Sequence, residues 1–428
     1  MNNVDNNQFK HLNADHFPTA TGQIKATIKG NKYAVKLDTA QDVSESFYQF
    51  ADAYFSSAEL IANRMLEKQN IAELDKYFFP LFFLYRHSIE LLLKSIACIL
   101  ITENSKRAQF FRDTFHNPET LLQQILCNTQ VRRPDDEIRW LEEYFHNLSE
   151  FDKASDSFRY PFHVKCKSDG LGSTCYSFNR VFSKQTHIDL IGEANKMQAA
   201  YEILKMWRLD FLDKDHMHVA KDFHSCSTLF LEEGGTYYEQ SVVGYEYHHD
   251  DFYAYCSGYM ECGNFLKQWL IEQYDQNAAN IEHLLYPMCY LYRNEAELLL
   301  KTIIYKEADF SRNEIGRITF ENKHSIFKLF SIIETAILPL YSLNANDQEI
   351  QNVKRYCNEL HSFDSDSSRF RYPVNKECVS YISTIRYYDF VALGDFLESL
   401  CNALDGIYSE IDHRREVIAE MQAEYANY

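Results

Sequence analysis

Charged residues spaced four apart in an apolar stretch are the first feature of the sequence that could do chemistry. Arg86, Glu90 and Lys94 lie at positions i, i+4 and i+8, so a helix would place all three on one face. Charges on a buried helix need partners. The stripe is therefore either an active or binding face, or an ion network that docks the helix against another part of the chain.

The same stripe returns in the second half of the chain. Residues 80–96 are repeated as residues 287–303, and a Phe-Arg-Tyr-Pro run with a preceding aspartate is repeated in the same order. Two motifs at nearly constant offset indicate an internal duplication. The repeated polar residues outside the first stripe are Asp152, Arg159 and Tyr160 in the first copy, and Arg293, Glu297, Lys301, Asp364, Arg371 and Tyr372 in the second.

The Phe-Arg-Tyr-Pro run predicts a turn or extended corner, because the residue before a proline is pushed out of the helical region. Its arginine either stacks and pairs inside the protein or presents a guanidinium to a phosphate. The two copies differ in their histidines, since His87 is replaced by Asn294 and His163 by Asn375. At these positions only the first copy has imidazoles that could act as acid or base near pH 7.

Hydrophobic periodicity predicts the elements that position these residues. Helices are expected over 44–69 and 71–100, matched by 251–273 and 278–305, followed by a third helix after Asn117 or His324 and a fourth ending at Asp152 or Asp364. Asp189 and Asp389 are expected to cap a last helix. Alternation over 23–36 and 228–247, around Gly30 and Gly234, predicts a β-hairpin before the helices of each copy.

We therefore expect a mainly α protein with two tandem helical-bundle repeats, each with a small β-hairpin or extended element, packed as an internal pseudo-dimer. The predicted boundaries are a flexible N-terminus over 1–19, a first repeat over 20–215 and a second over 225–428. Eleven cysteines without a CxxC pair indicate reduced thiols. With no secretory signal pattern and no uninterrupted apolar span, this predicts a cytoplasmic protein without a membrane partner.

The net charge of −19 is distributed unevenly between the two halves. Residues 1–220 hold 26 Lys and Arg against 29 Asp and Glu, whereas residues 221–428 hold 17 against 33. Nucleic-acid binding draws much of its affinity from cations. RNA contacts are therefore expected on the first repeat, and a basic protein partner is expected on the acidic second one.

The pattern Tyr-Arg-His-x-x-Glu-Leu-x-Leu-Lys, followed by Asp-x-x-Ser-x-x-Phe-Arg-Tyr-Pro, resembles bacterial domains of the HEPN superfamily over most of both halves. The resemblance implies a bundle of four or five helices that pairs into a dimer. Ribonuclease members place an Arg-x(4–6)-His motif from each protomer at the interface, whereas inactive members bind proteins or nucleotides. Many act in anti-phage defence or as members of toxin–antitoxin pairs, which predicts a role in bacterial stress or defence.

Four pairs satisfy that motif, where chance alone would give roughly two: Arg139/His146, Arg180/His187, Arg317/His324 and Arg355/His361. His146 aligns with Asn358, and His361 with Ser149, so these two pairs are not equivalent between the copies. The leading hypothesis is a metal-independent endoribonuclease or an RNA sensor. In it His87 and His146 act as acid and base, Arg86 and Arg139 stabilise phosphate charge, and Glu90 belongs to the same site.

Two alternatives remain open. One is a non-catalytic interaction module whose acidic second half binds or restrains a basic partner; the other is a small-ligand sensor that uses the polar stripes, and either could form homo-oligomers. No cofactor motif is present, so no cofactor is expected. Two histidine groups at predicted linker or hairpin ends are interpreted as surface residues and not as metal ligands: Asp215, His216 and His218, and His248, His249 and Asp250.

Overall fold

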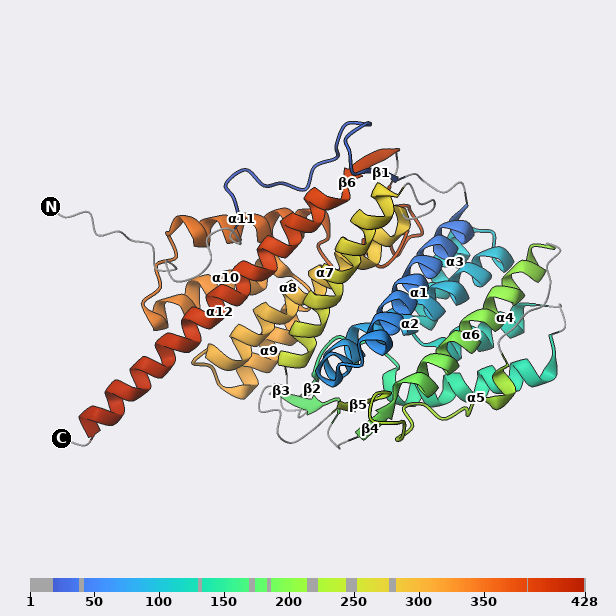
Figure 1. The fold of residues 1–428 in the computed structure, drawn as a ribbon, viewed down its shortest axis with the longest axis horizontal. Helices are drawn as coiled ribbons and strands as arrows, with labels where there is room; N and C mark the ends of the chain where they lie inside the picture. The colour runs from blue at the N-terminus through green and yellow to red at the C-terminus, as the bar shows by residue number, and fades with distance from the viewer. Residues whose placement is uncertain are drawn as a thin grey trace.

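The computed structural model describes residues 18–37, 42–129, 133–168, 174–182, 186–213, 222–243, 252–276, 282–382 and 384–426. The protein is mainly helical, as predicted (Figure 1). The first half contains β1 (Ala34–Leu37), α1 (Val43–Lys68), α2 (Ile71–Leu100), α3 (Asn104–Thr114), α4 (Pro118–Asn128), α5 (Asp135–Asp152), β2 (Phe162–Ser168), β3 (Thr174–Arg180), β4 (Thr186–Asp189) and α6 (Leu190–Phe211).

The second half repeats the order of the helices. It contains β5 (Gln240–Val243), α7 (Tyr253–Asp275), α8 (Leu285–Glu307), α9 (Arg312–Asn322), α10 (Ile326–Ile332), α11 (Gln348–Phe363), β6 (Arg386–Asp389) and α12 (Phe390–Ala426). Short 3-10 turns at Phe223–Ser225, Glu282–Leu284 and Leu338–Tyr341, and a π turn at Ile333–Ile337, complete the described elements. The predicted seam near residues 214–227 and both histidine groups fall largely or wholly outside the described residues.

The centre of the protein is formed by α2 and α8, which carry the two polar stripes. Helix α2 begins where the Asn70 side chain accepts a hydrogen bond from the Ala72 amide at 3.2 Å. From Tyr77 to Cys98 every residue of α2 is buried. A helix that is buried all round is packed on all sides. The charges of its stripe therefore face other parts of the protein and not solvent.

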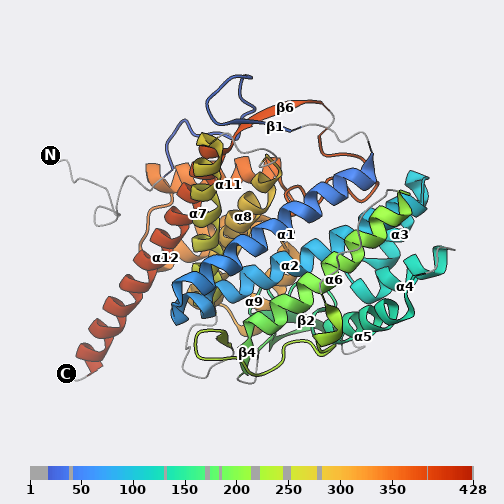
Figure 2. The same ribbon diagram turned by 45° about the vertical axis from the view of Figure 1, so that its right-hand side comes forward.

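Helices from the two halves are packed against each other around this centre. Helix α2 contacts α1, α6 and α7, and α8 contacts α7 and α12. In Figure 1, α1 and α7 lie side by side along the middle of the molecule, with α2 and α6 beyond α1 and α8 and α12 beyond α7. The C-terminal part of α12 extends past the rest of the protein in both views (Figures 1 and 2).

The hairpins predicted before each set of helices are wrong, because these strands pair between the halves. β1 pairs antiparallel with β6, and β5 pairs antiparallel with β4. The two ladders lie at opposite sides of the molecule (Figure 1). Both end at the aspartates predicted to cap the last helices: Asp189 accepts from the Gly192 amide at 2.9 Å, and Asp389 accepts from the Val391 and Ala392 amides at 3.0 Å. Period-two alternation indicates a strand but does not identify its partner.

Two helices were not predicted from the sequence. Helices α3 and α9 each precede the predicted third helix, and their polar surfaces obscure the periodic signal. The described hairpin is β2–β3, with Phe162 opposite Arg180 and Ser168 opposite Thr174. It packs against α9 of the other half.

None of the helices in the described ranges is long and apolar enough to cross a membrane.

Candidate functional site

The first polar cluster is centred on Glu90, whose carboxylate is fully buried within α2. Its Oε1 atom accepts hydrogen bonds from Lys94 Nζ at 2.6 Å and from Tyr372 Oη at 2.9 Å, and it lies 2.9 Å from His116 Nδ1. Its Oε2 atom accepts from Arg86 Nη1 at 3.3 Å. Four polar side chains therefore converge on one carboxylate, and one of them comes from the other half of the chain.

The second cluster repeats this arrangement around Glu297 on α8. Oε1 accepts from Lys301 Nζ at 2.7 Å and from Tyr160 Oη at 2.6 Å, and it lies 3.0 Å from His324 Nδ1. Oε2 accepts from Arg293 Nη1 at 2.7 Å. The geometry thus pairs the two clusters residue by residue.

The tyrosines show how the two halves exchange their Phe-Arg-Tyr-Pro corners. Tyr160 of the first half completes the second cluster, and Tyr372 of the second half completes the first. Each corner is also held by a helix of the opposite half: Tyr54 of α1 donates to the Phe370 carbonyl at 3.1 Å, and Tyr259 of α7 donates to the Phe158 carbonyl at 3.2 Å. Each cluster is therefore composite.

An ion network, one of the two interpretations of the stripe, is present at the base of each cluster. Arg86 Nε lies 3.7 Å from Asp152 Oδ2, and Arg293 Nε lies 3.5 Å from Asp364 Oδ2. A second guanidinium nitrogen of Arg86 donates to the carbonyl of His116, and that of Arg293 donates to the carbonyl of His324 at 2.5 Å. Each arginine thus fixes the backbone that presents a histidine, which is a positioning role.

The charges of the first cluster fix the tautomer of its histidine. Burial by itself would raise the pKa of Glu90, but Lys94 and His116 outweigh burial and hold it well below its usual range. Burial lowers the pKa of the His116 imidazole, against the opposing effect of Glu90. A neutral imidazole beside a carboxylate keeps its proton on the nitrogen that faces the carboxylate. Nδ1 therefore donates to Glu90, and Nε2 carries the lone pair.

The second histidine is in the same state. Burial lowers the pKa of His324 to about 4, although Glu297 opposes the shift. Burial would raise the pKa of Glu297, but Lys301 and His324 hold it well below its usual range. Among the described residues, Nε2 of neither histidine has a hydrogen-bond partner. Each ring therefore offers a free base while its carboxylate partner orients it, as in a general-base dyad.

A groove of about 480 Å³ connects the two histidines. Both His116 and His324 line it, together with residues of α3, α9 and the second corner. The lining includes five cations, Lys94, Arg112, Lys323, Arg371 and Lys376, against two carboxylates, Glu321 and Asp366. In a chain of net charge −19, this local excess of positive charge favours an anionic ligand.

Three residues predicted to be catalytic lie elsewhere. His87 is fully buried, its Nε2 lies 3.0 Å from the Arg371 carbonyl, and burial lowers its pKa well below the usual value. Arg139 and His146 are exposed on α5, where His146 Nδ1 lies 3.0 Å from Glu119 Oε1. None of the three lines the groove. The structure places Arg86, Glu90 and Lys94 on one face of α2, as the spacing predicted, and brings Arg86 close to Asp152.

The two corner arginines were expected either to pair inside the protein or to present a guanidinium to a phosphate. Arg159 is buried and donates to the Tyr160 hydroxyl at 2.8 Å, so its guanidinium is used inside the protein. Arg371 is also buried and donates through Nε to the Ser367 carbonyl at 2.5 Å, but it additionally lines the groove. Arg371 is thus bonded inside the protein and can still contact a ligand in the groove.

His116 was missed as a site residue, and His324 was considered only as the partner of Arg317. In the structure Arg317 is half exposed and bonds Glu321 on its own helix. The available signal was the position of both histidines one residue before a helix cap, since Asn117 caps α4 and Ser325 caps α10. Aligning the third helices of the two copies would have paired them.

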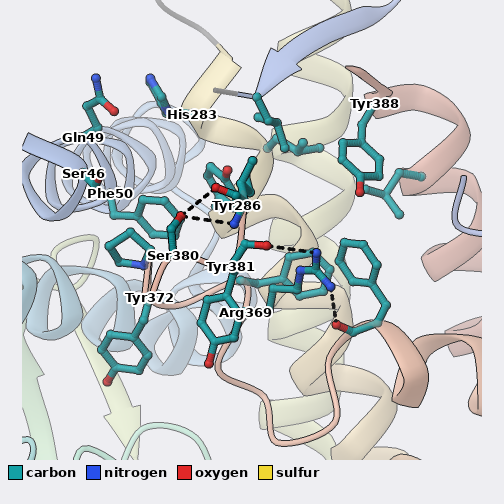
Figure 3. A pocket seen from close by; sticks show the side chains of 17 residues that line it. Ser46, Gln49, Phe50, His283, Tyr286, Arg369, Tyr372, Ser380, Tyr381 and Tyr388 are labelled. Atoms are coloured by element: carbon teal, nitrogen blue, oxygen red, sulfur yellow. Dashed lines mark hydrogen bonds between the residues drawn. The ribbon is translucent and has the colours of Figure 1, made fainter. Parts of the chain in front are cut away.

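A separate cavity behind the second corner is too small to be the site. Its volume is about 40 Å³, whereas ligand pockets usually enclose about 300–1,000 Å³. Figure 3 shows Arg369 in this cavity, where it donates to the carbonyls of Phe363 at 3.0 Å and Tyr381 at 3.5 Å. In the described ranges no three His, Cys, Asp or Glu side chains are grouped so that they could hold a metal ion.

The comparisons with known proteins leave the site to be interpreted from its geometry. No protein-family model matches the chain. No curated protein and no solved structure is similar to it either.

Proposed function

We propose that the chain is an RNA-directed protein that binds the phosphate backbone in the groove and cleaves it without a metal ion. The observation that carries this proposal is the pair of neutral imidazoles, each oriented by a buried, ionised glutamate and each lining one cationic groove. RNA supplies both a phosphate for the cations and a 2′-hydroxyl that a free imidazole can deprotonate.

The roles of the two histidines follow from their charge state. One imidazole takes the proton of the 2′-hydroxyl, whose oxygen then attacks the adjacent phosphorus. A bound phosphate places negative charge beside the other imidazole and so raises its pKa, which favours its protonation. The resulting imidazolium gives a proton to the departing 5′-oxygen, so His116 and His324 serve as base and acid.

The cations of the groove have a separate role. Lys94, Lys323 and Arg371 line it with side chains from both halves. Positive groups that are already in place stabilise the charge that develops on a phosphate in the transition state. In this proposal RNA contacts residues of both repeats, whereas the charge balance of the sequence predicts contacts on the first repeat.

The resemblance to HEPN domains supports this proposal from a different direction. In that superfamily an active histidine from each protomer lies at a dimer interface, and here two histidines lie in one groove lined by both halves. We propose that the two halves are tandem HEPN-like repeats that form this pair within one chain. A bacterial stress or anti-phage role, and membership of a toxin–antitoxin pair, are proposed on the same resemblance.

The test is cleavage of total cellular RNA and labelled tRNA by the purified chain in the presence of EDTA. Wild type is compared with His116→Gln, His324→Gln and the double variant. Loss of a general acid or base costs about 10²- to 10⁴-fold in rate, so each single variant is expected to lose most of the activity. Glutamine keeps a polar side chain of similar size, which limits damage to the cluster.

His146→Gln is the matched control, because this histidine also contacts a glutamate but lies on the exposed face of α5. It should cleave like wild type. Equal loss in His146→Gln and His324→Gln, or unchanged cleavage in the His116→Gln/His324→Gln double variant, would contradict the proposal. No cleavage by wild type, together with salt-dependent RNA binding, would reduce it to an RNA sensor.

The alternative is a non-catalytic module that binds a basic protein through the second repeat. It is favoured by the 33 acidic against 17 basic residues over 221–428. If the wild type neither cleaves nor binds RNA, this alternative is supported. Association with a basic partner should then weaken steeply as salt is raised.

A further inference from the structure

A second cavity opens beside the second cluster. It has a volume of about 210 Å³ and shares Lys323 and His324 with the groove. Its other walls come from the β2–β3 hairpin, the first corner, α8 and α9. A ligand held by the groove at His324 could therefore extend into this cavity without crossing the protein.

The walls of the cavity are mainly aromatic. They include Phe162, Phe178, Phe252, Tyr305 and Phe320. Phe162 stacks on Tyr305 with ring centroids 5.1 Å apart, and Phe178 meets Tyr305 edge-on at 5.4 Å. Since the rings are held by one another, they form a preformed wall and need no ordering when a ligand binds.

The size of the cavity limits the ligand to one ring system. A volume near 210 Å³ accommodates a single planar heterocycle and is smaller than the roughly 300–1,000 Å³ of a pocket for a whole ligand. The lining also includes a polar pair, since His163 Nε2 and Asp156 Oδ1 are 3.1 Å apart and both side chains are partly exposed. Such a pair can exchange hydrogen bonds with the rim of a base while the aromatic walls contact its faces.

The rim toward the groove is cationic. Lys323 is exposed and lines both the cavity and the groove. Lys301, whose ammonium is bound to Glu297, also lines the cavity and lies 3.9 Å from the centre of the Tyr160 ring. Aromatic walls beside a cationic track are the combination that binds single-stranded nucleic acid, because each base can stack while its phosphate is neutralised.

The cavity belongs to one cluster and not to both. Its hairpin, β2–β3, follows the first corner, whereas the described part of the second corner has in its place an isolated bridge between Val374 and Ser380. At the first cluster the groove is bordered instead by Phe47, Phe111 and Phe115. The two histidines are thus chemically alike but differ in what surrounds them.

We propose that the cavity is a nucleobase subsite, which takes one unpaired base of the RNA whose phosphate lies beside His324 and Lys323. This inference rests on the proposed phosphate groove. It adds which end of the groove the base occupies and which phosphate it adjoins. The base enters on the His324 side, so the chain acts on single-stranded or looped RNA and selects the nucleotide at one position.

The test is isothermal titration of the full chain with the four ribonucleoside 5′-monophosphates, with ribose 5-phosphate and with inorganic phosphate. The nucleotides are expected to bind more tightly than ribose 5-phosphate by on the order of tenfold or more, the usual worth of one stacked base. Phe320→Ala should abolish most of this difference and leave ribose 5-phosphate binding unchanged. Phe320 is 42% exposed, so its truncation should not unfold the protein.

Tyr237→Ala is the control variant, since Tyr237 is an exposed aromatic residue that lines neither the cavity nor the groove. It should retain the nucleotide preference. Equal binding of nucleotides and ribose 5-phosphate by wild type, or loss of the preference in Tyr237→Ala and not in Phe320→Ala, would overturn the subsite while leaving the phosphate groove intact. Failure of all phosphates to bind would overturn both.

Discussion

Replacing Tyr372 by phenylalanine tests whether the second half completes the first cluster. The change removes the hydroxyl that donates to Glu90 at 2.9 Å and keeps the ring, over which the Lys94 ammonium lies at 4.7 Å. Burial raises the pKa of Tyr372 well above its usual value, so the phenol stays a donor across the accessible pH range. Tyr160→Phe makes the equivalent change at Glu297, where the bond is 2.6 Å.

The expected cost follows from the charge of the acceptor. A hydrogen bond to a charged group contributes about 1.5–3 kcal/mol, and the acceptor, Glu90, is fully buried. We expect each variant to lower the free energy of unfolding by about 2 kcal/mol. The assay is equilibrium urea unfolding followed by circular dichroism, with midpoints compared at equal slope.

Tyr144 supplies a matched control for the loss of a buried phenol hydroxyl. It is fully buried on α5, and its hydroxyl has no hydrogen-bond partner among the described residues. Removing an unsatisfied buried hydroxyl should be neutral or stabilising. A Tyr372→Phe variant no less stable than Tyr144→Phe would refute the composite cluster, because its defining bond between the halves would then contribute nothing.

Three further predictions concern the charges of the clusters. Glu90→Gln leaves buried cations without their carboxylate and should lower the free energy of unfolding by about 3–5 kcal/mol; a cost below about 1 kcal/mol in urea unfolding would contradict it. His324 has a pKa of about 4 in the folded protein and about 6.5 in the unfolded chain, so the unfolded chain binds the proton first as the pH is lowered. The free energy of unfolding should therefore decrease by at most about 3 kcal/mol as the pH is lowered from 6.5 to 4. This slope should be reduced in His324→Gln when thermal melts are compared across that window. His87→Asn, which copies Asn294, should cost about 1 kcal/mol and leave RNA cleavage within a few-fold of wild type in the tRNA assay.

Local signals in the sequence were enough for the charged stripe and for the helices other than α3 and α9. Arg86, Glu90 and Lys94 share a helix face because the helical repeat puts i and i+4 side by side. Asp189 and Asp389 cap their helices because capping depends on the first turn alone. These features involve residues close in the chain, which is why their spacing predicted them.

Features that join distant segments were not predicted. The strand before each set of helices alternates as expected, but its partner is a strand of the other half, so β1 pairs with β6 and β4 with β5. Alternation specifies which face of a strand is buried, and it carries no information on the neighbouring strand. The predicted hairpins failed for this reason.

The sequence by itself determined that the chain is duplicated, that two apolar helices carry identical polar stripes, and that an arginine and a tyrosine follow each at a corner. Only the tertiary structure decided that each tyrosine bonds the glutamate of the opposite half and that His116 and His324 share one groove. The physical reason is that a buried carboxylate can be satisfied by any donor that packing brings within reach. Packing between the halves, and not spacing along the chain, selects those donors.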